Sequence, residues 1–309
     1  MDVAHLTFIH GIGNKSESEV LHQSWRRALA KDGGIDLGAE GVTSSMIYWA
    51  DVMYAEPKPE ADVHESAEEG AVDTDREDVD LAFRDAASAE EQEWLEKFAA
   101  KYRLDSELPP DEESSVGESG PEFERVPLPG WMKKRIMSAF LRDVHHYLWD
   151  AWHSPRPGED FRVRTEIRRR VQQSLVDGAK SGAPHVIVSH SMGTVIAYDN
   201  LQRVAECPAV DGLITIGSPL GIDEIQDQLS PEWSRHDGFP VKTKSWINIY
   251  DRLDPVAGLD PLIMNDYQRR GSDAVVDINE QNWGTWRHSI TKYLAGDQLR
   301  EQLGSMLEL

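Results

Sequence analysis

Cysteine is almost absent from this sequence. The 309 residues contain one, Cys207, so no disulfide bond can form within the chain. The segment that starts the chain has neither a basic region nor a long apolar one, so we expect no secretory signal and a reducing, cytoplasmic location. Long apolar runs are absent too. No stretch reaches the roughly 18 apolar residues of a membrane span, which predicts no stable membrane insertion.

Basic residues are also scarce. The chain has 32 Lys and Arg against 55 Asp and Glu, a formal net charge of -23, and 25 acidic but only seven basic residues lie between Asp51 and Arg125. Nucleic-acid binding requires a basic surface, so we expect no nucleic-acid partner. The acidic stretch either forms a solvated surface or attracts a basic protein partner.

Metal-binding and phosphate-binding motifs are missing as well. No H-E-x-x-H or C-x-x-C pattern occurs, and the adjacent residues His145 and His146 point to different faces of a helix, so we expect no metal site. The turn His10–Gly13 contains glycines but fits neither G-x-G-x-x-G nor a loop ending in G-K-[ST]. We therefore expect no cofactor.

Short apolar strands alternate with helices in two parts of the chain. Strands are predicted at 6–9, 42–49, 185–188, 212–216, 244–250 and 274–278, and helices at 18–31, 164–180, 194–204 and 289–307. Strands that are separated by helices predict an α/β fold, with a mostly parallel central sheet that carries helices on both faces.

Residues 51–159 interrupt this alternation. We predict a large, acidic and partly helical insertion there, between the core segments 1–50 and 160–309. Helical spacing occurs over 77–102 and over 131–152. The apolar stripe of the second helix consists of Ile136, Met137, Phe140, Leu141, Val144 and Leu148, with Tyr147 beside it. This helix is either a mobile lid over the carboxyl edge of the sheet or a helix packed permanently on the core.

Ser191 stands where an apolar strand meets a helix with almost no loop between them. A sharp strand-to-helix turn strains its central residue and requires small neighbours, as in the pattern G-x-S-x-G. Gly193 fits this pattern, and Ser189, also small, replaces the first glycine. The N-terminus of the following helix favours an oxyanion, so Ser191 is the candidate nucleophile. An ordinary turn with a serine cap is the alternative.

The turn His10–Gly13 after the first strand, taken together with the Ser191 turn, resembles the α/β-hydrolase superfamily, particularly its lipases and esterases. The resemblance covers residues 3–50 and 162–305 but not the insertion. It implies the α/β-hydrolase fold and catalysis by a serine, a histidine and an acid.

In that family the acid and then the histidine follow the serine along the chain. His288 precedes the final helix, where the family places its catalytic base, whereas His236 comes before the strand that should deliver the acid. The resemblance implies an acid on the loop after that strand, and Asp254, which precedes a proline, fits best. Its rivals are Asp251 and Asp260.

The resemblance also implies an oxyanion hole made by two backbone N–H groups, those of Met192 and Ile12. Candidates for substrate binding are His10 and Gly11 in the first of these turns, and Trp283 and Trp286, which flank His288 and either line an acyl pocket or pack on the sheet.

The predicted function is cleavage of a small-molecule carboxylic ester through an acyl-enzyme, as in a carboxylesterase or lipase. A thioesterase, a peptidase or an acyltransferase uses the same residues, so these activities stay open. A second class of hypothesis is a non-catalytic binding module that uses the acidic insertion as its functional surface.

Overall fold

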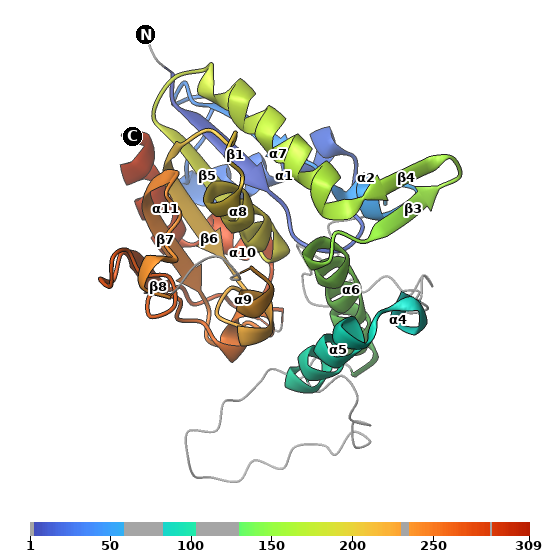
Figure 1. Cartoon of the computed structure of the whole chain (residues 1–309). Coiled ribbons are helices and arrows are strands. Elements are labelled where there is room, and N and C mark those ends of the chain that lie inside the picture. The colour runs from blue at the N-terminus through green and yellow to red at the C-terminus, as the bar shows by residue number, and fades with distance from the viewer. Residues whose placement is uncertain (1–2, 59–82, 103–129, 230–234, 285) are drawn as a thin grey trace.

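The computed structural model describes residues 3–58, 83–102, 130–229, 235–284 and 286–309, with a six-stranded sheet at its centre (Figure 1). The strand order is β2-β1-β5-β6-β7-β8, and every neighbouring pair is parallel. The strands are β1 (His5–Ile9), β2 (Thr43–Ile47), β5 (His185–His190), β6 (Val210–Ile216), β7 (Thr243–Tyr250) and β8 (Val275–Asn279). The predicted α/β fold with a parallel sheet is therefore confirmed.

Helices cover both faces of the sheet. Side chains alternate along each strand, so Val186 and Val188 of β5 pack on one face and Ile187 packs on the other. The first face is covered by α1 (Ser18–Ala30), α10 (Ile290–Ala295) and α11 (Asp297–Leu307), and the second by α7 (Val163–Ala179), α8 (Met192–Arg203) and α9 (Asp223–Leu229). Short 3-10 turns lie at Lys31–Gly33, Arg235–Asp237 and Ala257–Leu259.

Two features differ from the sequence-based expectation. A single helix over 289–307 is wrong, because Gly296 has an extended backbone and separates α10 from α11. A side chain at Gly296 would come within 2.4 Å of the Glu280 carboxylate, which accepts a hydrogen bond from the first turn of α11. The hairpin of β3 (Trp152–Arg156) and β4 (Glu159–Arg162) was not predicted, because both strands are short and β3 contains a proline.

The structure describes only part of the predicted insertion. The helices described in this region are α2 (Ala50–Met53), α4 (Phe83–Ala86), α5 (Ala89–Lys101) and α6 (Gly130–Leu148). The prediction of a helix over 77–102 is testable only from Phe83 onward, and there the helix breaks at Ala87–Ser88, where Ser88 caps α5. The helix predicted over 131–152 ends four residues early. Most of the acidic stretch and the side chains of Ile136 and Met137 lie outside the described residues.

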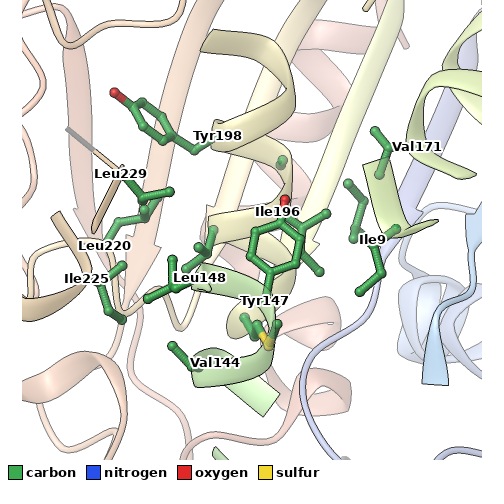
Figure 2. Packing of buried hydrophobic residues seen from close by; sticks show 14 of the residues in the cluster. Ile9, Val144, Tyr147, Leu148, Val171, Ile196, Tyr198, Leu220, Ile225 and Leu229 are labelled. Atoms are coloured by element: carbon green, nitrogen blue, oxygen red, sulfur yellow. The ribbon is translucent and has the colours of Figure 1, made fainter. Parts of the chain in front are cut away.

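The helices α5 and α6 pack into the same apolar cluster as one face of the sheet. Trp94 stacks on Phe98 within α5 with ring centroids 4.7 Å apart, and Phe98 lies 5.5 Å from Phe140 of α6. Figure 2 shows Val144, Tyr147 and Leu148 of α6 beside side chains of α8 and α9. Full burial of a large apolar side chain contributes roughly 1.5–3 kcal/mol, so these contacts hold the two helices on the core.

Hydrogen bonds add to this packing. The indole N–H of Trp94 donates to the carbonyl oxygen of Glu224 in α9 at 2.7 Å, and the hydroxyl of Tyr147 donates to the carboxylate of Asp199 in α8 at 2.7 Å. Buried polar groups are stable only when they find such partners. The helices of the predicted insertion are thus tied to the core by both apolar and polar contacts.

His146 of α6 makes folding stability depend on pH. Burial, followed by the nearby charges of His145 and His153, lowers the pKa of His146 to about 3. The unfolded chain therefore binds more protons than the folded chain between about pH 6.5 and pH 3, and stability falls as the pH is lowered through that window. For this one residue, linkage predicts that the unfolding free energy falls by about 2 kcal/mol between pH 7 and pH 5.

Replacing His146 with phenylalanine, which suits its contact with Phe83, is expected to remove that share of the pH dependence. Urea unfolding of wild type and His146→Phe at pH 7 and pH 5 measures it. The fall in unfolding free energy should be smaller in the variant by about 2 kcal/mol. Equal falls in both proteins would show that His146 does not contribute.

Candidate active site

The topology directs attention to the carboxyl ends of β1 and β5. These two strands are neighbours, yet the chain continues from β1 outward to β2 and from β5 in the opposite direction to β6. Loops that leave adjacent strands in opposite directions leave a crevice between them, where ligands of open α/β sheets bind. The turn His10–Gly13 follows β1 and Ser191 follows β5, so both lie at this crevice.

Ser191 has the strained backbone that its sharp turn requires, with φ 54° and ψ -127°. A positive φ is uncommon for a residue with a side chain and costs of order 1–3 kcal/mol. Two backbone hydrogen bonds hold the turn, from Ser191 N to the carbonyl of Ile216 (3.0 Å) and from Thr194 N to the carbonyl of Ser191 (2.9 Å). Gly193 must be glycine, because a Cβ there would lie 2.5 Å from the carbonyl oxygen of Ile9.

The turn after β1 lies directly against the Ser191 turn. A Cβ on Gly11 would come within 2.8 Å of the Cβ of Ser191 and 3.3 Å of Nδ1 of His190. The absence of a side chain at Gly11 thus lets two backbones approach that are far apart in sequence. Ile12, whose N–H is one predicted oxyanion donor, follows Gly11, and Met192, the other, is the first residue of α8.

Asp254 and His288 form a buried pair. Nδ1 of His288 lies 2.8 Å from each carboxylate oxygen of Asp254, and the hydroxyl of Tyr293 donates to Oδ2 at 2.8 Å. Burial raises the pKa of the Asp254 carboxyl, but the charge of His288 and these hydrogen bonds outweigh it and hold the pKa below its usual value. An ionised Asp254 accepts the Nδ1 proton, which leaves Nε2 of His288 as the basic nitrogen.

The two rival carboxylates are engaged elsewhere. Asp251 accepts hydrogen bonds from the N–H of Leu253 (2.7 Å) and the N–H of Asn282 (2.7 Å), and it pairs with the guanidinium of Arg287 at 3.1 Å. It therefore ties down the loop that leads to His288. The backbone of Asp260 packs against Gly221. His288 pairs with Asp254 rather than with either rival.

Several buried atoms at this crevice have no hydrogen-bond partner within the described part of the chain. Among them are Oγ of Ser191 and Nε2 of His288, on residues that are 1% and 4% exposed. An alcohol and the basic nitrogen of an imidazole are the two groups that nucleophilic catalysis by serine requires. Gly217, with a positive φ, makes room for the pair, because a Cβ there would lie 3.1 Å from both Asp254 and His288.

His190 was not predicted as a site residue. Its Nε2 lies 3.0 Å from the carbonyl oxygen of His288, and the two rings are 4.6 Å apart. Burial, followed by the charge of His288, holds the pKa of His190 well below its usual value, so the ring is neutral and donates this bond. His190 thus ties the Ser191 turn to the His288 loop. The only signal in the sequence is its place beside Ser191.

The remaining predicted site residues lie at different distances from the pair. The ring of His10 stacks on Trp49 with centroids 4.8 Å apart. Its Nε2 accepts the backbone N–H of Trp49 (3.0 Å), and its Nδ1 lies 2.8 Å from the carbonyl oxygen of Gly11. Both ring nitrogens of His10 therefore support the turn. Trp286 is buried, 5.8 Å from the His288 ring. Trp283 is 55% exposed, with the Lys292 ammonium 5.8 Å from its ring.

Other kinds of site find little support in the described ranges. They contain no group of three or more His, Cys, Asp or Glu arranged to hold a metal ion. No helix among the described residues is long and apolar enough to cross a membrane. A hollow of about 500 Å³ runs between β2 and α7, past Ser45, Tyr48 and Arg169, and Ser191 is not part of its lining.

Comparisons with known proteins do not assign the chain to a family. The chain matches no protein-family model, and no curated protein matches its sequence. Among solved structures it is similar to the crystal structure of an uncharacterized protein from Pseudomonas aeruginosa, with 9% identity and a TM-score of 0.31. The match covers 91% of this chain and 40% of the other, so the chain spans less than half the length of that protein. At this TM-score the similarity carries no argument about function.

Proposed function

We propose that the chain is a serine hydrolase of the α/β-hydrolase type, with Ser191 as nucleophile, His288 as general base and Asp254 as the acid that orients it. One observation supports the proposal most strongly. The buried Asp254–His288 pair and the strained Ser191 turn lie at the same edge of the sheet, and neither Oγ of Ser191 nor Nε2 of His288 has a hydrogen-bond partner among the described residues.

The proposed reaction transfers an acyl group to water. Oγ of Ser191 attacks an ester carbonyl carbon while Nε2 of His288 takes its proton, and Asp254 stabilises the imidazolium that forms. The tetrahedral intermediate then collapses, and the leaving alcohol receives the proton from His288. Water attacks the acyl-enzyme with the same base, which releases a carboxylic acid and regenerates Ser191.

The oxyanion of the intermediate is held by the backbone N–H groups of Met192 and Ile12. Met192 begins α8, so the helix dipole adds to its hydrogen bond. Within the described part of the chain, the N–H of Ile12 donates no hydrogen bond, which leaves it available to an oxyanion. Donors of this kind contribute roughly 10²–10³ in rate each.

A carboxylic ester is the proposed substrate, because its hydrolysis needs no group beyond the serine, the histidine, the aspartate and the two oxyanion donors. Substrates with a thioester or amide carbonyl react through the same steps.

Ser191 is 1% exposed, so a substrate reaches it only after something above the crevice moves. In this proposal α5 and α6 form that cover. Tyr102, at the end of α5, lies 3.4 Å from the carbonyl oxygen of Val256, two residues after Asp254.

Labelling with a fluorophosphonate tests the proposal, because this reagent reacts with an activated serine and leaves a stable adduct. We expect labelling of wild type and of Ser24→Ala, a control on α1, and none of Ser191→Ala. Mass spectrometry should place the adduct on Ser191. Unlabelled wild type would favour the non-catalytic binding module, and labelled Ser191→Ala would identify another nucleophile. Hydrolysis of p-nitrophenyl esters of increasing acyl length then defines the substrate.

A further inference from the structure

Two side chains hold a single peptide group in the turn after β1. The ammonium of Lys15 donates to the carbonyl oxygen of Ile12 at 2.5 Å, and the N–H of Gly13 donates to Oδ2 of Asp143 at 3.0 Å. These two groups belong to the planar peptide unit that joins Ile12 to Gly13. Bonds at both of its ends fix the orientation of that plane.

The preceding peptide unit is held at one end only. The carbonyl of Gly11 accepts a hydrogen bond from Nδ1 of His10, whose Nε2 in turn accepts the N–H of Trp49. The N–H of Ile12, at the other end of this unit, is the one that the proposed reaction uses. With its own carbonyl end held and the following plane held at both ends, the direction of that N–H is determined.

The surroundings of Asp143 fix its carboxylate as an acceptor for the N–H of Gly13. It lies on α6, is fully buried, and both of its oxygens are occupied: Oδ1 by the guanidinium of Arg142 (2.8 and 3.0 Å) and Oδ2 by Gly13 and the hydroxyl of Tyr54 (3.1 Å). Burying a carboxylate costs several kcal/mol unless it is satisfied in this way. Removing this carboxylate alone would leave the N–H of Gly13 and the guanidinium of Arg142 without their acceptor.

Lys15 is equally unusual. It is 1% exposed, although lysine is almost never fully buried. Its charge is among the causes that lower the pKa of His190, so that charge reaches the turn that carries Ser191. A cation bound to the turn after β1 also favours the negative charge that develops on the substrate oxygen.

We propose that Asp143 and Lys15 are positioning residues that orient the Ile12 N–H for the oxyanion, and that Asp143 couples the docking of α6 to the assembly of the oxyanion hole. This inference rests on the proposed function. Its consequence is that the predicted insertion is part of the catalytic apparatus: when α6 leaves the core, the turn after β1 loses the acceptor that holds it.

The test compares Asp143→Ala and Lys15→Met with Asp277→Ala in the full chain. Asp277 of β8 is the control, because its carboxylate also holds backbone N–H groups, those of Ile263 (3.0 Å) and Met264 (2.9 Å), while its bonds, including one from Asn248, go to neither α6 nor the turn after β1. We expect kcat for a p-nitrophenyl ester and the rate of fluorophosphonate labelling to fall about 10²-fold in the first two variants, with KM changed less than about threefold. The control should lose stability but keep its kcat within about threefold.

The outcomes separate the two proposals. If wild type is not labelled, the proposed function fails. If wild type is labelled on Ser191 but Lys15→Met, which is nearly isosteric, keeps its kcat within about threefold, the positioning role is overturned. It is also overturned if Asp143→Ala and Asp277→Ala lose kcat equally. Lys15→Met keeps the test decisive should Asp143→Ala fail to fold.

Discussion

Replacing Asp254 with asparagine is expected to lower kcat for ester hydrolysis about 10⁴-fold while the protein stays folded. The asparagine oxygen can still accept the N–H groups of Val256 and Ala257, which now bond Oδ1. Its amide NH₂ would face Nδ1 of His288 and force that nitrogen to accept. The ring proton then moves to Nε2, the nitrogen that must take the proton of Ser191, so the base is lost.

The matched control is Asp251→Asn on the same loop. Asp251 bonds backbone N–H groups and Arg287 rather than His288, so we expect a loss of stability and a kcat within about tenfold of wild type. Steady-state kinetics with a p-nitrophenyl ester and circular dichroism of each variant make the comparison. A larger loss of kcat in Asp251→Asn than in Asp254→Asn would contradict the assignment of the acid.

The second large effect is expected from Gly11→Ala. The added Cβ would lie 2.8 Å from the Cβ of Ser191, closer than two such atoms come in proteins, and neither is the end of a flexible side chain. The two turns must therefore separate, which moves the Ile12 N–H away from the oxyanion. We expect kcat to fall about 10²-fold and unfolding free energy to fall by about 1–3 kcal/mol.

Gly41→Ala is the control for the second variant. Gly41 has a positive φ of 71°, and a Cβ there would meet nothing within 4 Å. This change adds the same methyl group away from the crevice, together with the cost of alanine at a positive φ that Gly11 does not have. Its kcat should equal that of wild type. If Gly11→Ala keeps full activity, the turn after β1 does not contribute to the reaction.

Local patterns in the sequence are enough to predict much of this molecule. Six strands and most of the helices follow from apolar periodicity, which depends only on neighbouring residues. The Ser191 turn is predictable in the same way, because a small residue on each side of a strand-to-helix junction is a local requirement, and its observed φ of 54° agrees with that reasoning. The break at Gly296 was missed because it depends on Glu280, sixteen residues earlier.

Contacts between distant residues required the tertiary structure. In the sequence only the proline after it favours Asp254 over Asp251, and the fold shows that Asp254 is the one that pairs with His288. Asp143 carries no signal in the sequence, because the peptide group that it holds is 130 residues away. Lys15 is only three residues from the carbonyl that it binds, but its burial is decided by the fold. Periodicity sets which face of an element is buried, but strand register and the path of each loop set which side chains meet. The proposed nucleophile is therefore readable from its own segment, whereas the pairing of Asp254 with His288, the contact of His190 with the His288 loop and the support of the turn after β1 are not.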